Sequence, residues 1–279
     1  MKKLLSRRKP MSASRPSRKM AFDLTKAKAL FFDIYATLID WEAGIYPLLL
    51  RLSQKAESPS NRLEDTPESR TKLLRAFAKH DKAVGHESPT LAYAQVIEEI
   101  YARIAKDLGA EFSKEDQQAF GQSIGDWPAF PDTVEAMKVL GKYYKVFVLS
   151  NVDNASFERT RTGPLRGGHW DGIYTAEMVG SYKPSPNNYN YVVKRLEEDF
   201  SIKKDEMLLV AQSLDIDHIS TKALGFQPGV WIARESSAMG GIKDELEQQG
   251  LVELGATYAT LGDMAEAVKK AFESKRTST

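Results

Sequence analysis

Residues 29–35 read Ala-Leu-Phe-Phe-Asp-Ile-Tyr, a short apolar run that meets an acidic residue at Asp33. The run is aromatic and does not alternate with polar residues, which is typical of a strand buried on both faces of a parallel sheet. Helix-forming segments separate it from similar runs later in the chain, at residues 145–150, 172–175, 207–211, 229–232 and 256–258. Strands that alternate with helices predict an α/β fold, in which helices cover both faces of a parallel sheet.

The helices between these strands also leave boundary signals. One is expected to begin at Asp132-Thr133 and to end near Gly141. Ser185-Pro186 fits a helix N-cap followed by proline at the first helical position. A last helix is expected at residues 262–272.

Residues 43–128 have a different character, because apolar residues recur there at helical spacing without a strand-like run. A polar stretch rich in helix breakers, residues 58–68, predicts a loop within this segment. The helical block interrupts the strand-helix alternation directly after the first strand, where it can cover that edge as a lid. We therefore expect a basic, disordered tail at 1–25, an α/β core at 26–42 and 129–279, and a helical domain at 43–128.

The composition, with 42% hydrophobic and 28% charged residues, is that of an ordinary soluble globular protein. The 279 residues include no cysteine, which excludes a disulfide scaffold, thiolate metal ligands and a cysteine nucleophile. No stretch approaches the roughly 18 apolar residues of a membrane span. We expect a cytoplasmic protein without a transmembrane segment.

The first 20 residues hold eight Lys or Arg and no acidic residue, while the remainder carries a net charge of −7. Such a start could be a mitochondrial targeting peptide or a tail that contacts nucleic acid or lipid. We favour a plain unstructured extension, and we expect no nucleic-acid partner.

Polar side chains directly follow three of the predicted strands, at the edge where parallel α/β sheets bind their ligands. They are Asp33, then Ser150 and Asn151, then the segment from Gln212 to Asp217. A carboxylate such as Asp33 could act as a nucleophile, or it could only cap a turn. The hydroxyl and amide of Ser150 and Asn151 could hold an anion, or they could form a turn.

Lys183 precedes the predicted helix start at Ser185-Pro186, where its charge opposes the helix dipole. That cost favours a functional lysine that pairs with Asp33 and attracts anions, although a surface lysine is the alternative. Asp217 could orient water as a base beside Lys183, or it could cap the helix that follows.

In this order the segments resemble the motifs of the haloacid dehalogenase-like superfamily. The first is residues 32–40, Phe-Asp-Ile-Tyr-Ala-Thr-Leu-Ile-Asp, the second is 148–151, the third is 182–186, and 210–217 takes the place of the fourth. The nearest branch is the L-2-haloacid dehalogenase group with its fungal-type relatives. The resemblance implies a three-layer, Rossmann-like core with an inserted helical cap, and a site between the two.

The resemblance also implies roles for single residues. Asp33 matches the nucleophile, Lys183 the essential lysine and Asp217 the last acidic residue. The residues that it assigns to the substrate are Tyr35, an arginine of the cap for which we choose Arg75, Ser150, Asn151 and Tyr189. It implies hydrolysis of a short 2-haloacid to a 2-hydroxyacid, with a small anionic substrate and no metal or other cofactor. Whether the chain forms a homodimer is left open.

Two residues separate this chain from the magnesium-dependent phosphatases of the superfamily. Tyr35 stands where those enzymes need a general acid, and neutral Gln212 stands where they place a magnesium ligand. A phosphatase that uses Mg²⁺ on a small metabolite is nevertheless kept as an alternative. So is a catalytically weakened binding protein, because Gln212 and Leu214 replace the polar pair that the dehalogenases carry there.

Overall fold

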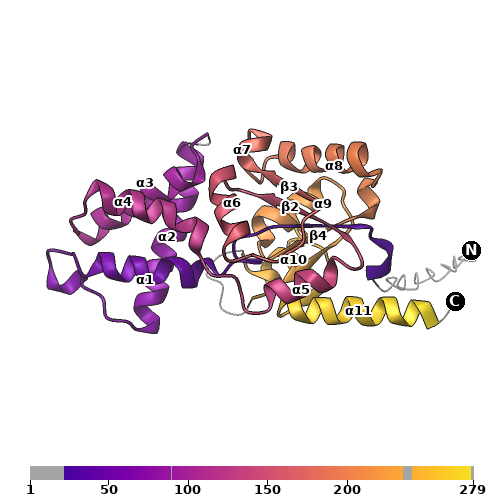
Figure 1. Ribbon diagram of the computed structural model, residues 1–279. Helices are drawn as coiled ribbons and strands as arrows, with labels where there is room; N and C mark the ends of the chain where they lie inside the picture. The colour runs from indigo at the N-terminus through magenta and orange to yellow at the C-terminus, as the bar shows by residue number, and fades with distance from the viewer. Residues whose placement is uncertain (1–21, 89, 235–240, 278–279) are drawn as a thin grey trace, which may run out of the picture.

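The computed structural model describes residues 22–88, 90–234 and 241–277 (Figure 1). Its sheet has six strands in the order β3-β2-β1-β4-β5-β6, and each pair of neighbours is parallel. The strands are β1 Ala29–Phe32, β2 Lys145–Ser150, β3 Gly172–Thr175, β4 Met207–Ala211, β5 Gly229–Ile232 and β6 Leu254–Tyr258. Because β1 lies between β2 and β4, the strand order reverses beside it, and Asp33 follows this central strand.

Alternate residues of β1 enter two different hydrophobic clusters. Leu30 and Phe32 belong to the cluster that contains residues of α5 and α11, whereas Ala29 and Phe31 pack with residues of α8. Helices therefore cover both faces of the sheet, which explains the absence of polar alternation in the strand and confirms the predicted three-layer α/β core.

The helix just before β2 and the helices after it pack around this sheet. They are α5 Thr133–Leu140, α6 Asn154–Thr162, α7 Ala176–Val179, α8 Pro186–Phe200, α9 Ile219–Ala223, α10 Lys243–Gln248 and α11 Leu261–Thr277, with a short 3-10 helix η4 Lys204–Glu206 and a π-helix η5 Leu214–His218. The side chain of Ser185 accepts a hydrogen bond from the Asn187 backbone at the start of α8, as the sequence predicts. The last helix runs five residues beyond the predicted end at residue 272.

A helical segment lies between β1 and β2 and gathers at one side of the sheet (Figure 1). Its elements are α1 Trp41–Ser53, η2 Pro59–Asn61, α2 Pro67–Glu87, α3 Tyr93–Leu108, α4 Lys114–Gln122 and η3 Ser123–Asp126. The loop predicted at 58–68 is too long, because Thr66 caps α2 and Pro67 occupies its first turn. The limits 43–128 of the helical domain stay a prediction. The first helix of the segment, α1, begins at Trp41, shortly before the lower limit.

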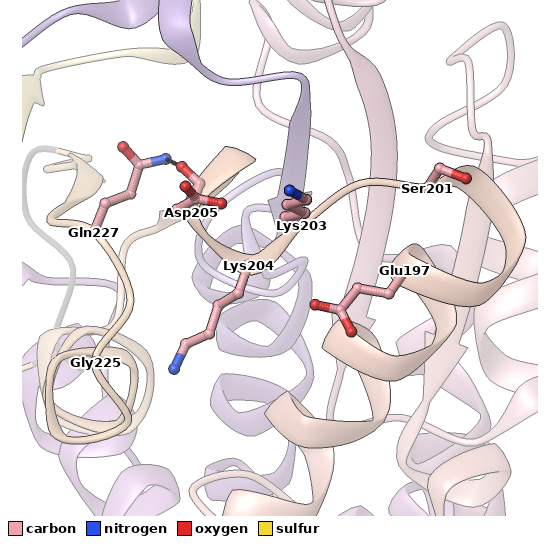
Figure 2. Close-up of a pocket in the computed structure, with 7 residues that line it drawn as sticks. All are labelled: Glu197, Ser201, Lys203, Lys204, Asp205, Gly225 and Gln227. Carbon is pink, nitrogen blue, oxygen red and sulfur yellow. Dashed lines mark hydrogen bonds between the residues drawn. The ribbon is translucent and has the colours of Figure 1, made fainter.

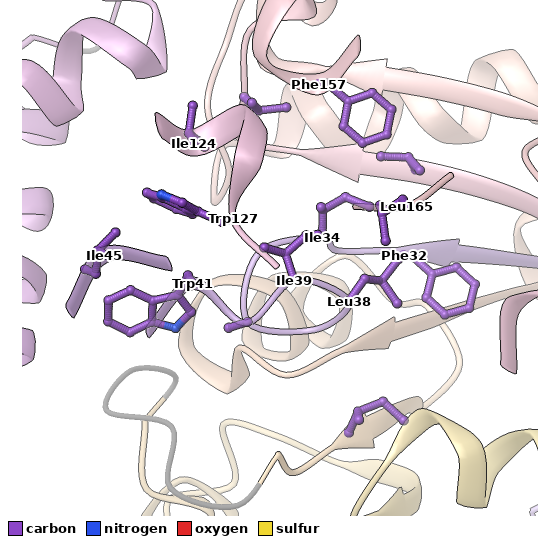
Figure 3. Packing of buried hydrophobic residues seen from close by; sticks show 14 of the residues in the cluster. Phe32, Ile34, Leu38, Ile39, Trp41, Ile45, Ile124, Trp127, Phe157 and Leu165 are labelled. Atoms are coloured by element: carbon purple, nitrogen blue, oxygen red, sulfur yellow. The ribbon is translucent and has the colours of Figure 1, made fainter. Parts of the chain in front are cut away.

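The chain leaves the sheet and returns to it along one path. The Asp40 backbone N–H donates to the Pro128 carbonyl at 2.8 Å, and the Phe130 N–H donates to the Leu38 carbonyl at 3.1 Å. Apolar side chains around this path, including Ile39, form one cluster that continues from the sheet into the helical segment (Figure 3). The loop after β1 is therefore fixed from both sides.

Most of the predicted tail 1–25 lies outside the described residues, which begin at residue 22. At its end, Leu24–Lys26 forms a 3-10 helix, η1. Leu24 is buried, and its carbonyl accepts a hydrogen bond of 3.0 Å from the Tyr144 hydroxyl. None of the helices in the described part of the chain is long and apolar enough to cross a membrane.

Candidate active site

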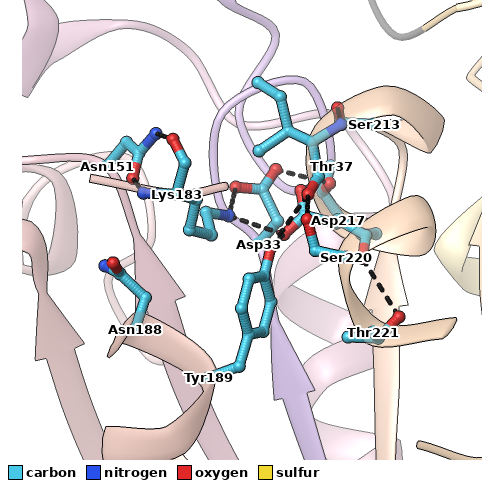
Figure 4. A network of polar contacts seen from close by, with 12 residues as sticks. Asp33, Thr37, Asn151, Lys183, Asn188, Tyr189, Ser213, Asp217, Ser220 and Thr221 are labelled. Atoms are coloured by element: carbon cyan, nitrogen blue, oxygen red, sulfur yellow. Dashed lines mark hydrogen bonds and ion pairs between the residues drawn. The ribbon is translucent and has the colours of Figure 1, made fainter. Parts of the chain in front are cut away.

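Asp33, Lys183 and Asp217 form a buried triad of charges at the carboxyl edge of the sheet (Figure 4). The Lys183 ammonium donates to Asp33 Oδ1 and to Asp217 Oδ1, both at 2.8 Å. The three residues are 8%, 4% and 1% exposed. They come from the ends of β1 and β4 and from the loop before α8, so the predicted convergence of these residues occurs.

Burial has opposite effects on the two kinds of charge in the triad. It raises the pKa of Asp217 to about 7, although Lys183 opposes the rise. Burial alone would lower the pKa of Lys183, but the charges of Asp217 and Asp33 outweigh it, and this pKa is raised. Lys183 is therefore a permanent cation, while Asp217 can exchange a proton near neutral pH.

Thr37 completes the environment of Asp33, and sequence reasoning did not single it out. Its hydroxyl donates to Asp33 Oδ2 at 2.9 Å and accepts the Gln212 backbone N–H at 2.9 Å. Each Asp33 oxygen thus has its own donor, Lys183 on one and Thr37 on the other. Ala36 has a φ of 74°, in the left-handed region that favours glycine.

Ser150 is the last residue of β2 and Asn151 follows it, and the two side chains have different contacts. The Asn151 amide forms two hydrogen bonds with the Lys183 backbone, at 2.6 Å to its N–H and 2.9 Å to its carbonyl. Asn151 therefore fixes the position of the lysine. Ser150 is 1% exposed, and its Oγ has no partner among the described residues, so it can still bind a substrate atom.

Tyr189 of α8 lies on the other side of the triad. Its hydroxyl donates to the Ile216 carbonyl at 2.9 Å and lies 3.4 Å from Asp217 Oδ1. It is fully buried, which fits the supporting position that the family resemblance implies. It does not reach solvent and is not placed to contact a substrate directly.

The segment after β4 is a π-helix, η5, which presents Asp217. Ser213 caps it by accepting the Ile216 N–H, so Asp217 is not the helix cap that the sequence left open. Asp217 Oδ2 has no hydrogen-bond partner among the described residues. Leu214 is fully buried, so it adds packing and no polar contact at this point. Local π-helices are frequent at functional sites.

Two of the predicted substrate-binding residues have no hydrogen bond to the triad in the described part of the chain. The Tyr35 hydroxyl pairs with Thr160 at 3.0 Å, and its ring packs edge-on against Trp127. Arg75 is exposed on α2 and lines a hollow of about 560 Å³ with Pro67 and Lys72. The structure does not bring Arg75 to the site, because it lies off the apolar face of α2 that packs inward.

A magnesium ion would find a poor donor set around Asp33. In the described residues no group of three or more His, Asp or Glu side chains could hold a metal ion. The two carboxylates are joined by the Lys183 ammonium, which repels a cation, and position 212 carries a neutral glutamine. Magnesium prefers several oxygen ligands, so these residues do not fit it well.

Figure 2 shows a larger surface hollow, of about 720 Å³. Its lining comes from the end of α8 and from the turns just before β4 and β5, at the edge of the sheet opposite the triad, and includes Lys204, whose ammonium donates to the Leu224 carbonyl. Ligands of parallel α/β sheets bind at the carboxyl ends of the strands, so we do not place the reaction in this hollow.

A family model described as haloacid dehalogenase-like hydrolase matches residues 27–214. The chain is similar in structure to the L-2-haloacid dehalogenase PA0810, with a TM-score of 0.66 at 20% identity over 88% of this chain and 99% of that one. For L-2-haloacid dehalogenase from Xanthobacter autotrophicus with chloropropionic acid covalently bound, the TM-score is 0.65 at 18% identity over 87% and 98%. For the putative hydrolase YfnB from Bacillus subtilis bound to magnesium it is 0.62 at 15% identity over 87% and 98%. No curated protein matches the sequence.

Proposed function

Because this chain belongs to the haloacid dehalogenase-like hydrolases, we propose that it hydrolyses a short 2-haloacid to a 2-hydroxyacid through an ester on Asp33. An oxygen of the Asp33 carboxylate attacks the carbon that bears the halogen, and the halide leaves with the bonding electrons. Water then attacks the ester carbonyl carbon, which releases the hydroxyacid and restores the carboxylate. A small organic anion is the expected substrate.

The contact between Lys183 and Asp33 carries this proposal. A carboxylate with one oxygen held by an ammonium at 2.8 Å and the other by a hydroxyl at 2.9 Å has a fixed orientation. A halide needs no proton to leave, so a tyrosine at position 35 is no obstacle to the first step. The covalent adduct named for the Xanthobacter autotrophicus neighbour supports the same chemistry.

Asp217 is suited to the second step. Its Oδ1 is held by Lys183, while its Oδ2 has no partner among the described residues and can accept a proton from the attacking water. A pKa near 7 means that it is available as a base around neutral pH.

The second candidate is a magnesium-dependent phosphatase. It is supported by the similarity to the Bacillus subtilis hydrolase, which is bound to magnesium. The local donor set speaks against it, as does Tyr35, whose hydroxyl pairs with Thr160, in place of a general acid. A catalytically weakened binding protein is the third candidate, which the buried Leu214 favours. Homodimer formation and a cytoplasmic location remain predictions.

A substrate screen separates these candidates. Purified protein is incubated with short 2-chloro- and 2-bromoacids and with p-nitrophenyl phosphate, with and without magnesium, and released halide and phosphate are measured. We expect halide release that a chelator does not affect. Phosphate release that a chelator abolishes would support the phosphatase, and anion binding without either product would support the binding protein.

A further inference from the structure

The start of α3 is docked onto the loops that carry the site residues. The Ala94 backbone N–H donates to Asp153 Oδ2 at 3.4 Å, and the Tyr182 hydroxyl donates to the Leu91 carbonyl. Asp153 follows Asn151 by two residues, and Tyr182 directly precedes Lys183. Tyr93, the first residue of α3, is therefore held beside the carboxyl edge of the sheet.

The side chain of Tyr93 is hydrogen-bonded to the carboxylate of Asp81. Its hydroxyl donates to Oδ1 of Asp81, from α2, at 2.9 Å, and both side chains are half-buried. Burial raises the pKa of Tyr93, and the charge of Asp81 and the proximity of Tyr182 and Tyr35 raise it further. Burial, then Asp153 and Asp81, raise the pKa of Tyr182 to about 12. The hydrogen bond to Tyr93 holds the Asp81 carboxylate beside the start of α3, which is itself bound to Tyr182 and Asp153.

The helical segment offers no arginine at this place. Four of the five arginines within residues 43–128 donate to other groups of the described segment: Arg51 to Pro47, Arg62 to Ala56, Arg70 to Glu42 and Arg103 to Glu87 and Glu99. The fifth, Arg75, is exposed on α2. At the start of α3 the helical segment therefore offers the carboxylate of Asp81 and the hydroxyl of Tyr93.

We propose that Asp81 and Tyr93 bind the end of the substrate that points away from Asp33, and that they select small carboxylic acids with a hydroxyl or ammonium group at that end. This inference rests on the proposed function for the position of the substrate. An ionised carboxylate has about four acceptor sites, and Tyr93 uses one of them. A ligand that ends in a methyl group would bury the remaining acceptors without donors, which costs affinity.

Binding of three product-like probes tests the proposal without turnover. Glycerate, isoserine and 2-hydroxybutanoate have the same length and end in hydroxyl, ammonium and methyl, respectively. Isothermal titration calorimetry on the full chain should give glycerate or isoserine an affinity at least about tenfold above that of 2-hydroxybutanoate. The preferred probe of the two identifies the group that the natural substrate carries.

Variants assign the preference to the pair. Asp81→Leu should remove it, Tyr93→Phe should reduce it, and Asp81→Asn should reduce isoserine binding more than glycerate binding. Glu68→Gln, an exposed carboxylate on the same helix, should leave all three affinities unchanged, and circular dichroism checks that each variant is folded. Equal affinities in the unaltered protein, or a preference that survives in folded Asp81→Leu, would overturn the inference. A preference without halide release from any haloacid would instead refute the proposed reaction and leave the recognition pair standing.

Discussion

The sheet region and the helical segment differ in how many charged side chains they bury. Among the described residues of the sheet region, the buried Lys, Arg, Asp and Glu side chains are Asp33, Asp153, Lys183, Asp217 and Arg234. In the described part of the helical segment only Glu42 of α1 is buried, paired with Arg70 of α2 at 3.2 Å, and other ion pairs such as Lys55 with Asp116 are exposed. Burying an ion costs several kcal/mol even after relaxation, whereas exposed pairs contribute little. The triad at the sheet edge thus carries a stability cost that chemistry explains better than folding does.

Asp33→Asn gives the largest expected effect. The amide keeps the shape of the side chain but is a far poorer nucleophile, so we expect kcat for halide release to fall by about a thousandfold or more. Steady-state halide release measures it. Asp116→Asn in the helical segment is the matched control and should keep full activity. An Asp33→Asn protein with undiminished turnover would mean that the buried charges at the sheet edge are not explained by this chemistry.

The pH dependence of the second step comes next. Asp217 acts as a base only when it has lost its proton, and burial raises its pKa to about 7, so the rate should fall as the pH drops through that value. Asp217→Asn should lower kcat by about a hundredfold and remove this limb of the profile. Buffers from acidic to neutral pH with a constant ionic strength provide the test. An unchanged acidic limb in the variant would assign it to another group.

Thr37→Val should have a smaller effect on both stability and rate. The substitution keeps the shape but takes a donor from Asp33 and an acceptor from the Gln212 N–H. We expect a loss of about 1–3 kcal/mol in the free energy of unfolding and about tenfold in kcat. Urea denaturation and kinetics measure the two quantities. Thr37→Ser, which keeps the hydroxyl, should restore most of the rate, and a Thr37→Val protein as active as the original would contradict the role of this residue.

The smallest effect is expected for the exposed pairs of the helical segment. Lys55→Ala breaks the ion pair with Asp116, whose members remain in contact with water. The melting temperature should not change measurably at physiological salt, since such pairs are screened and carry an entropic cost. Differential scanning calorimetry can check this. A clear loss of stability would mean that charge is organised in this segment as well.

The sheet edge of the site was predictable because parallel strands bring their carboxyl ends to one line. Apolar runs located the strands, so Asp33, Ser150 and Asn151 could be placed without coordinates. Lys183 was accessible through the helix start that follows it. Thr37 was not, because a threonine in a turn has no distinctive pattern until the register places it beside the Gln212 backbone.

The helical side of the site was not predictable in the same way. Periodicity located α2 and α3, but the rotation of each helix is set by its packing against the sheet region. Arg75 was chosen from this segment by loose alignment and lies on the exposed side of α2, whereas Asp81 of the same helix is half-buried and accepts a hydrogen bond from Tyr93. The single π-turn at η5 is likewise set by its surroundings, and residues 210–217 contain no pattern that indicates it.

The nucleophilic role of Asp33 is tested most directly by a single turnover in water enriched in heavy oxygen. With enzyme in excess over a 2-haloacid, mass spectrometry of the peptide that contains Asp33 should find one heavy oxygen in its carboxylate, while the hydroxyacid from that turnover carries none. A heavy oxygen in the hydroxyacid, with an unlabelled Asp33, would mean that water attacks the substrate itself and that no ester forms.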